Sequence, residues 1–526
     1  MRDVVVVGAG HNALVAACYL ARAGLDVEVV ERDAVVGGAV STVERFPGYR
    51  VDRGSSAHIM IRHTGIVEEL ELAGVGLRYL DCDPWGFAPV PGAPGGGITF
   101  WVDLDRTCAS VEAVCGPRDA AAYRRFVDEW GRRNERVFEA FQRPPTARVL
   151  GGALWRLGRG GPPGVELARQ FLAPADALLD ASFDDERLKT ALAWLAAQSG
   201  PPPFEVGTAD LLGWNALLHR RPPGRPVGGS GALSEALVRR LEAYGGRVRR
   251  GDGAARIDVR PGGRVGGVVT DAGERVAAGT VVAGCHVLTT YELLGEAVPL
   301  AERERVRRTV RVGNGVGMVV RVGCTALPAY PGAPREVNHG LVLAARDRWA
   351  LRAAFGDFCA GRPPTEPAVV AMAFSALDPT VAPPGRHNVS VWGQWYPYEL
   401  AGGQCWDGVG EREADTLLRA VERVAPGFRA TVEHVHVQTP LDLERELGLR
   451  RGNVMHVEMG LDSMFAWRPL PELARYRGPL PGLYLTGAST HPGGGVFGAS
   501  GRSAARTVLA DLARSRRRRG PALGGR

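Results

Sequence analysis

Residues 4–42 of the chain read VVVVGAGHNALVAACYLARAGLDVEVVERDAVVGGAVST. The first four residues form a continuous apolar run, which is typical of a parallel strand buried on both faces. A glycine turn follows, then a helical pattern of apolar residues that ends at Gly24, and then a second strand that ends in Glu31. This order of strand, glycine turn, helix, strand and carboxylate predicts a dinucleotide-binding unit.

The glycine turn has small residues at its three defining positions, Gly8, Gly10 and Ala13. Backbone N–H groups at the start of the following helix are expected to bind a pyrophosphate. Glu31 is expected to accept hydrogen bonds from a ribose diol. Ala13 replaces the third glycine of the motif and is small enough for the helix to pack on the strand.

A second glycine pair, Gly37 and Gly38, follows Glu31 after five residues, and Ser41 and Thr42 come shortly afterwards. Glycines there let a second loop approach the phosphates, and the two hydroxyls are predicted polar partners of the ligand. This spacing resembles the extended fingerprint of FAD enzymes of the amine oxidase and phytoene desaturase superfamily. The resemblance implies that FAD is the cofactor.

One position departs from that fingerprint. Many members carry an arginine after the glycine pair, where this chain has Ala39. Arg32 or Arg45 is expected to supply the missing phosphate contact. His58, in a stretch that also contains Gly54, follows a segment that runs along the flavin in the family. The resemblance implies that Gly54 contacts the cofactor.

A second glycine-rich segment lies near the other end of the chain. Residues 482–498 read GLYLTGASTHPGGGVFG, and a helical pattern follows over residues 499–514. The positive end of a helix suits the electron-rich edge of a reduced flavin. The segment is similar to the C-terminal signature of bacterial-type phytoene desaturases, except at Gly494. The residues that this similarity assigns to the flavin are Gly487, Gly493, Gly495, Val496 and Gly498.

Residues 226–300 contain a helix and then a meander of strands, which resembles the middle flavin-binding segment of the same family. The resemblance places Ile257 along the adenine, although Cys285 and His286 depart from the usual residues. The stretches GAGHNALVAACYLARAG, GYRVDRGSS and GLYLTGASTHPGGG look like the group called pyridine nucleotide-disulfide oxidoreductase domain-containing protein 2. The eight cysteines include no CxxC pair, which excludes a dithiol redox centre.

The predicted fold class is therefore α/β, with a discontinuous Rossmann-type FAD-binding domain and an inserted α+β substrate domain on a mixed or antiparallel sheet. The predicted parts of the FAD-binding domain are 1–75, 226–300 and 441–513. The predicted parts of the substrate domain are 76–225 and 301–440. Within the insertions the patterns predict a hairpin over 92–107, helices over 117–141 and 412–424, and strands over 316–322, 368–374 and 387–396.

The net charge of +7 is concentrated at the C-terminus. Residues 514–526 contain six arginines and no acidic residue, and they are predicted to be a disordered basic tail. We expect no nucleic-acid partner, because no aromatic residues interleave with these arginines. The cysteine and histidine spacings predict no metal site. The chain shows no signal peptide and no apolar run long enough to span a bilayer, so the expected location is the cytoplasm.

Residues 149–159 are apolar with interspersed arginines. They are either a peripheral membrane contact, which a carotenoid-like substrate would need, or a loop over the substrate domain. The oligomeric state stays open. Trp392, Trp395, Tyr396 and Tyr398 either line a hydrophobic tunnel or pack in the core.

The resemblance implies that a hydride passes from a C–H bond of a small lipophilic or secondary-metabolite substrate to flavin N5. A second fingerprint for NADPH is missing, so O2 or a quinone-like acceptor is expected to reoxidise the flavin. The candidate catalytic residues are His58 and His491, each of which has a purely structural alternative. The alternative functions are a redox-neutral isomerase with reduced FAD, a ketolase, or a non-catalytic flavin-binding regulatory protein.

Overall fold

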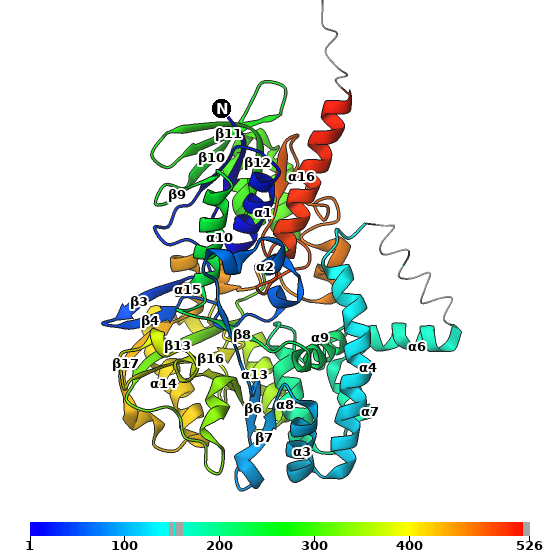
Figure 1. The fold of residues 1–526 in the computed structure, drawn as a ribbon, viewed down its shortest axis with the longest axis vertical. Helices are drawn as coiled ribbons and strands as arrows, with labels where there is room; N and C mark the ends of the chain where they lie inside the picture. Colours follow the sequence, from blue (N-terminus) through cyan, green and yellow to red (C-terminus); the bar gives the residue numbers. More distant parts are fainter. Residues whose placement is uncertain (147–151, 153–160, 519–526) are drawn as a thin grey trace, which may run out of the picture.

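The structure is a computed structural model that describes residues 1–146, 152 and 161–518. Figure 1 shows two sheet-based parts, one above the other, that the chain visits alternately. The first strand and the last helix both belong to the upper part, where α1 (His11–Arg22) and α16 (Ala499–Arg518) lie side by side. The segments that carry the glycine motifs therefore come together although they stand at opposite ends of the sequence.

The upper part is built on a seven-stranded sheet of order β10-β11-β12-β1-β2-β9, with β18 also paired to β12. The strands β9, β2, β1, β12 and β18 run parallel, and β10, β11 and β12 form an antiparallel meander. The strands of this sheet are β1 (Arg2–Val7), β2 (Val27–Val30), β9 (Arg247–Arg249), β10 (Ala254–Val259), β11 (Val265–Thr270), β12 (Arg275–Ala283) and β18 (Leu483–Leu485).

The apolar run in β1 explains its central place. Val4, Val5 and Val6 are fully buried, because the sheet is covered on both faces. One face packs on α1, α16 and α10 (Gly231–Ala243), and the other packs on α11 (Val287–Leu294) and α12 (Leu300–Thr309). Such continuous burial is what a parallel strand in an α/β sheet requires.

The lower part is built on a second seven-stranded sheet of order β17-β13-β16-β15-β14-β6-β7. Its pairings are antiparallel except for the parallel pair β14 and β6. Its strands are β6 (Gly86–Pro89), β7 (Gly97–Phe100), β13 (Gly317–Cys324), β14 (Leu341–Ala344), β15 (Val369–Met372), β16 (His387–Gln394) and β17 (Val432–Gln438). This confirms the prediction of a mixed or antiparallel sheet, since the sheet is mixed and most of its pairings are antiparallel.

Helices cover both faces of this second sheet. Its outer face packs on α14 (Trp406–Val424), and the opposite face packs on a helical layer whose core includes Trp85, Phe100 and Trp194. The helices of this layer and its surroundings are α3 (Leu104–Cys115), α4 (Pro117–Phe141), α6 (Gly161–Leu172), α7 (Ala175–Ser182), α8 (Glu186–Ala197), α9 (Ala209–Gly213) and α13 (Arg348–Cys359).

Short elements join the two parts. These are the hairpin of β3 (Thr42–Phe46) and β4 (Tyr49–Asp52), the pair of β5 (Tyr79–Asp81) and β8 (Gly224–Pro226), α2 (Ile66–Glu69) and α15 (Pro440–Leu447). Among the described helices, none combines the length and the apolar character that crossing a bilayer requires.

Two sequence predictions need comment. Helix α16 continues to Arg518 and so includes the first residues of the predicted basic tail 514–526, whose remaining residues lie outside the described part of the chain. Arginine is a good helix former, and cations are favourable at the C-terminal end of a helix. The predicted apolar and basic stretch 149–159 lies outside the described residues, apart from Gly152.

Candidate functional site

The glycine turn after β1 leaves the start of α1 open. Gly10 is the N-cap of this helix, and no side chain caps the first turn. In the described part of the chain, no atom lies within 4 Å of the place that a side chain on Gly10 would occupy. Backbone N–H groups therefore face free space at the positive end of a buried twelve-residue helix. This arrangement suits a pyrophosphate.

The carboxylate of Glu31 lies at the end of β2, beside this turn. Its Oε2 accepts a hydrogen bond from the Ala9 N–H at 2.6 Å, and its Oε1 accepts one from the Asp33 N–H at 2.9 Å. A carboxylate has about four acceptor sites, so lone pairs remain for two ribose hydroxyls. Glu31 thus fixes the turn and keeps its predicted capacity to bind a ribose.

The second glycine loop lies directly against the first. Gly37 donates its N–H to Ala9 O at 2.9 Å and pairs with Gly10 in an isolated bridge. Gly37 has φ 107°, and a side chain there would overlap Val40 and Ser234. This position requires glycine for both reasons.

The hydroxyls of Ser41 and Thr42 are used inside the protein. Ser41 donates to Gly38 O at 2.6 Å. Thr42 donates to Asp52 Oδ1 at 2.7 Å and accepts the Gly231 N–H at 2.8 Å. The two hydroxyl groups hold the second glycine loop against the start of α10. Their role as partners of the ligand stays a prediction.

The candidate arginines lie in different surroundings. Arg32 is exposed and reaches toward Gly448 at the end of α15, whereas Arg45 forms an ion pair with Glu446. A third arginine, Arg53, is nine-tenths buried and donates to Asp33 at 2.6 Å. Sequence reasoning missed Arg53, although it directly precedes the predicted Gly54.

The C-terminal loop between β18 and α16 reaches the glycine turn. Thr486 donates its N–H to Ala283 O at 2.9 Å, and the next residue, Gly487, lies against Gly284. Val496 accepts the Ile61 N–H at 2.7 Å. Gly493 lies beside Met459 and Arg468, Gly495 beside Phe497, and Gly498 beside Ile61, Ile66 and Val15.

The contact between α1 and α16 completes this convergence. Gly501 packs so closely on α1 at Asn12 that a side chain there would overlap the helix backbone. Ala13 packs against Gly284 at the end of β12 in the same way. The first and last predicted segments therefore meet at the start of α1.

Two further predicted residues lie on other segments of the chain. Ile257 lies in β10, and its buried side chain belongs to a core cluster with Val5 and Val268. Gly54 lies against Ala39, and no side chain would fit between them.

His58 is completely buried, and both of its ring nitrogens have partners. Nδ1 is hydrogen-bonded with the Tyr79 hydroxyl at 2.7 Å, and Nε2 with the Ser230 hydroxyl at 2.8 Å. Burial lowers the pKa of His58 to about 3. A neutral, doubly bonded imidazole of this kind ties the segment after β4 to the start of α10.

His491 is also buried, but one of its ring nitrogens is free. Nε2 donates to Ala140 O at 3.4 Å, and Nδ1 has no protein partner among the described residues. Burial lowers the pKa of His491 to about 4. The ring is stacked on Phe141, with ring centres 5.7 Å apart.

Three histidines that sequence reasoning did not choose lie around the same loop. His11, in the first turn of α1, bonds to the Gly495 backbone, and burial lowers its pKa to about 4. His286 donates through Nε2 to His456 O at 2.9 Å, and their rings stack 5.4 Å apart. The only sequence signal for the pair of His286 and His456 is that His286 stands where the family usually has another residue.

Arg468 is fully buried, and among the described residues it has no acidic partner. It donates to five backbone carbonyl oxygens at 2.7–3.2 Å. These belong to Met455, Val457, Glu458, Ser463 and Ala488. Burial lowers the pKa of Arg468 to about 9. One guanidinium therefore organises residues 455–463 beneath the C-terminal loop.

An aromatic cluster lies beside this loop. Phe141, Trp214 and Phe497 are buried, and their rings lie 5.2–6.4 Å apart. Phe465 packs against Phe141 and His491. Met459 and Met464 belong to the same cluster. The four aromatic residues that were candidates for a substrate tunnel do not belong to this cluster. Two of them, Trp395 and Tyr396, belong to the two hydrophobic cores of the lower part.

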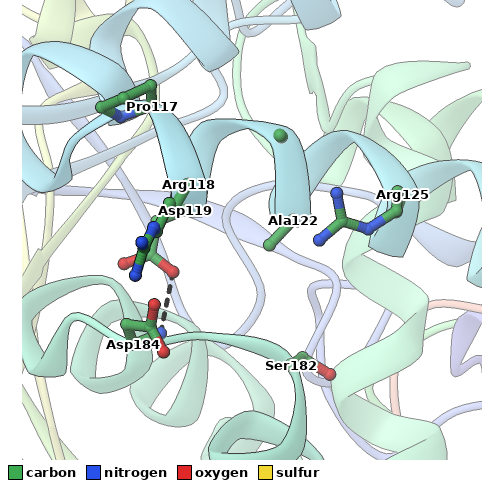
Figure 2. A pocket seen from close by; sticks show the side chains of 8 residues that line it. Pro117, Arg118, Asp119, Ala122, Arg125, Ser182 and Asp184 are labelled. Atoms are coloured by element: carbon green, nitrogen blue, oxygen red, sulfur yellow. Dashed lines mark hydrogen bonds between the residues drawn. The ribbon is translucent and has the colours of Figure 1, made fainter.

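A separate hollow of about 510 Å³ lies at the surface beside the start of α4. Figure 2 shows Arg118 and Arg125 at this hollow, and Asp119 accepting the backbone N–H of Asp184 at 2.8 Å. The hollow contains none of the predicted site residues. It is therefore distinct from the convergent glycine segments.

Comparison with known proteins agrees with this geometry. Residues 6–70 match the family model of the NAD(P)-binding Rossmann-like domain. The chain is 33% identical to pyridine nucleotide-disulfide oxidoreductase domain-containing protein 2 of Rattus norvegicus, over 97% of this chain and 94% of the relative. It is 25% identical to phytoene desaturase of Fusarium fujikuroi, over 94% of this chain and 86% of that protein.

Among solved structures, putrescine oxidase bound to putrescine superposes with a TM-score of 0.59 at 14% identity. The match covers 97% of this chain and 99% of that one. At this identity the similarity shows a shared fold, and it confirms the predicted fold class.

Proposed function

Because the chain belongs to the family of pyridine nucleotide-disulfide oxidoreductase domain-containing protein 2, and is an oxidoreductase related to phytoene desaturase, we propose that it is an FAD-dependent desaturase or dehydrogenase. The proposed substrate is a small lipophilic molecule or secondary metabolite that loses a hydride from a C–H bond. The observation that carries the proposal is the convergence of the two N-terminal glycine loops and the C-terminal loop at the open start of α1.

The residues around the start of α1 are of the kinds that binding of FAD requires. The free space beside Gly10 and the uncapped first turn of α1 would receive the pyrophosphate, and Glu31 would accept the ribose hydroxyls. The C-terminal loop would contact the flavin ring. When bound, FAD supplies the hydride acceptor, N5, and passes the electrons on to O2 or a quinone-like acceptor.

The protein would position an apolar substrate through the aromatic cluster of Phe141, Trp214, Phe465 and Phe497. These side chains offer large apolar surfaces next to the C-terminal loop, and they exclude water. The phytoene desaturase relative supports a desaturation as the reaction, because its name designates the introduction of a double bond.

His491 is the proposed proton acceptor. Formation of a double bond removes a hydride and a proton from neighbouring atoms, and the proton needs a neutral base. The Nδ1 of His491 is free of protein partners among the described residues, and its lowered pKa keeps the ring neutral. His58, with both nitrogens bonded, is better suited to holding the segment that follows β4.

The test is anaerobic incubation of the purified protein with candidate apolar substrates while the visible flavin band is followed. We expect the band to bleach and the product to be lighter by two hydrogens. In a parallel incubation in air, an unchanged product mass would indicate an isomerase, and oxygen added from O2 would indicate a ketolase. Protein that stays colourless after added FAD would overturn the cofactor assignment, and bound flavin that no candidate bleaches would favour a regulatory role.

A further inference from the structure

A small internal cavity lies between the second sheet and the segment that follows β4. It is lined by Asp52, Ser56 and Arg225 on one side, and by Arg321 of β13 and Ser390 of β16 on the other. It leaves about 10 Å³ for the centre of a water-sized group. That volume suits a single small occupant.

The first arginine of this cavity is neutralised within the protein. Asp52 and Arg225 form a buried ion pair. The other carboxylate oxygen of Asp52 accepts the Ser230 N–H at 2.8 Å. Burial would raise the pKa of Asp52, but Arg225 and these hydrogen bonds hold it below its usual value. Asp52 is therefore ionised and balances one guanidinium.

The second arginine, Arg321, has no acidic hydrogen-bond partner among the described residues. Arg321 is 2% exposed. It donates to Ser390 Oγ at 2.9 Å, and more weakly to Gly54 O and Gln438 Oε1, both at 3.4 Å. None of these acceptors is charged. Although burial lowers its pKa to about 10, Arg321 stays protonated at neutral pH, so the cavity carries an uncompensated positive charge.

In the part of the chain that the structure describes, no other carboxylate supplies the missing negative charge. Asp52 is engaged with Arg225, and Glu446, the other acidic group that acts on Arg321, is paired with Arg45 and does not line the cavity. A buried cation without a counter-ion is unfavourable.

Among the described residues, three polar atoms of side chains that line the cavity also lack a hydrogen-bond partner. Ser56 Oγ, Arg225 Nε and Arg321 Nε are buried, and none has a hydrogen-bond partner in the described part of the chain. Buried polar atoms without partners are rare in folded proteins. Here three of them, all able to donate, belong to side chains that line one cavity with an excess positive charge.

We propose that this cavity binds one small monovalent anion, either a free halide or the carboxylate of a molecule as small as formate. The anion would accept hydrogen bonds from Arg321 Nε, Arg225 Nε and Ser56 Oγ, and it would neutralise Arg321. Because Arg321 also bonds to Gly54 O, the anion would fasten the cofactor-side segment 54–56 to the second sheet. Larger anions such as gluconate are excluded by the volume.

The first test is thermal unfolding of the full-length protein in sodium chloride, bromide, formate, gluconate and sulfate at matched ionic strength. Chloride or formate should raise Tm by about 1 °C for each tenfold increase above its Kd. A rise with halides identifies a free halide, and a rise with formate alone identifies a carboxylate. Equal shifts in all five salts, or no shift, would overturn the proposal.

Variants make this test specific. Arg321→Met should abolish the anion-specific rise, because it removes the unpaired charge. Arg308→Met is the matched control, since Arg308 lies on α12 with its side chain 75% exposed, and it should keep the full rise. A rise that survives in Arg321→Met would contradict the assigned site.

A crystallographic measurement decides the question if Arg321→Met does not fold. Crystals of the unmutated protein soaked in bromide should show an anomalous peak within hydrogen-bond distance of Arg321 Nε and Arg225 Nε. If formate alone stabilises the protein, planar formate density should appear there instead. Density for a water molecule in both soaks would overturn the proposal.

Discussion

The carboxylate of Glu31 lies 2.6 Å from the backbone nitrogen of Ala9, so the acid that ends β2 also holds the turn that follows β1. The same side chain reaches the Asp33 N–H. Glu31 therefore joins two loops by hydrogen bonds. It is also the residue predicted to accept hydrogen bonds from the ribose hydroxyls. Its substitution should affect cofactor binding through both roles.

We predict that Glu31→Gln lowers the affinity for FAD about 10-fold and Glu31→Ala about 100-fold, because hydrogen bonds to a charged acceptor contribute about 1.5–3 kcal/mol. Titration of the apoprotein with FAD, followed by fluorescence quenching, measures the change. Glu235→Gln is the control, since Glu235 is partly exposed and pairs with Arg250. Unchanged affinity in Glu31→Ala would remove Glu31 from the site.

The buried pair of Asp52 and Arg225 gives a stability prediction. Asp52→Asn leaves the Arg225 guanidinium buried without its counter-charge, which should cost about 3–5 kcal/mol. Asp105→Asn, at an exposed pair with Arg124, should cost under about 1 kcal/mol. Denaturant unfolding measures both, and equal effects of the two substitutions would contradict the prediction.

The same pair predicts a pH effect. The pKa of Asp52 is lowered in the folded protein, so its contribution to stability is present above its unfolded value of about 3.9 and is lost as pH falls further. Tm of the unmutated protein should therefore fall more steeply below about pH 4 than Tm of Asp52→Asn. Parallel profiles of the two proteins would show that the pair is not coupled to protonation.

His58 should make the protein less stable as pH falls. Its pKa is about 3 in the folded protein, against about 6.5 in the unfolded chain. Between these values only the unfolded chain binds the proton, so stability decreases from about pH 6.5 toward pH 3. His58→Gln should flatten the pH dependence of Tm in this range. A limb of the rate profile that disappears in His58→Gln would instead assign His58 a catalytic role.

A substitution in the aromatic cluster should weaken binding of the substrate and leave binding of FAD unchanged. Phe141→Leu removes a ring that stacks on His491, and we expect KM for an apolar substrate to rise about 10-fold, as the loss of about 1.4 kcal/mol of contact would produce. FAD affinity should stay unchanged. Phe183→Leu, in the separate core of the lower part, is the control and should leave KM unaltered.

Local sequence patterns predicted several of the strands, helices and loops. The apolar run at residues 4–7 became the buried centre of β1, and the helix predicted over 117–141 is α4, Pro117–Phe141. The spacing of Gly10, Glu31 and Gly37 predicted two loops that lie against each other in the structure, because the first loop follows β1 and the second follows β2, two neighbouring parallel strands. The family fingerprint then identified the C-terminal loop.

The sequence by itself therefore determined the helices, the strands and the glycine loops. Periodicity and turn chemistry act over a few positions, so a local pattern records them. Only the tertiary structure decided which buried charges meet. Asp52 and Arg225 are 173 positions apart, and Arg321 joins them from a different sheet. Their energies depend on burial and on partners brought from elsewhere, which no local pattern records.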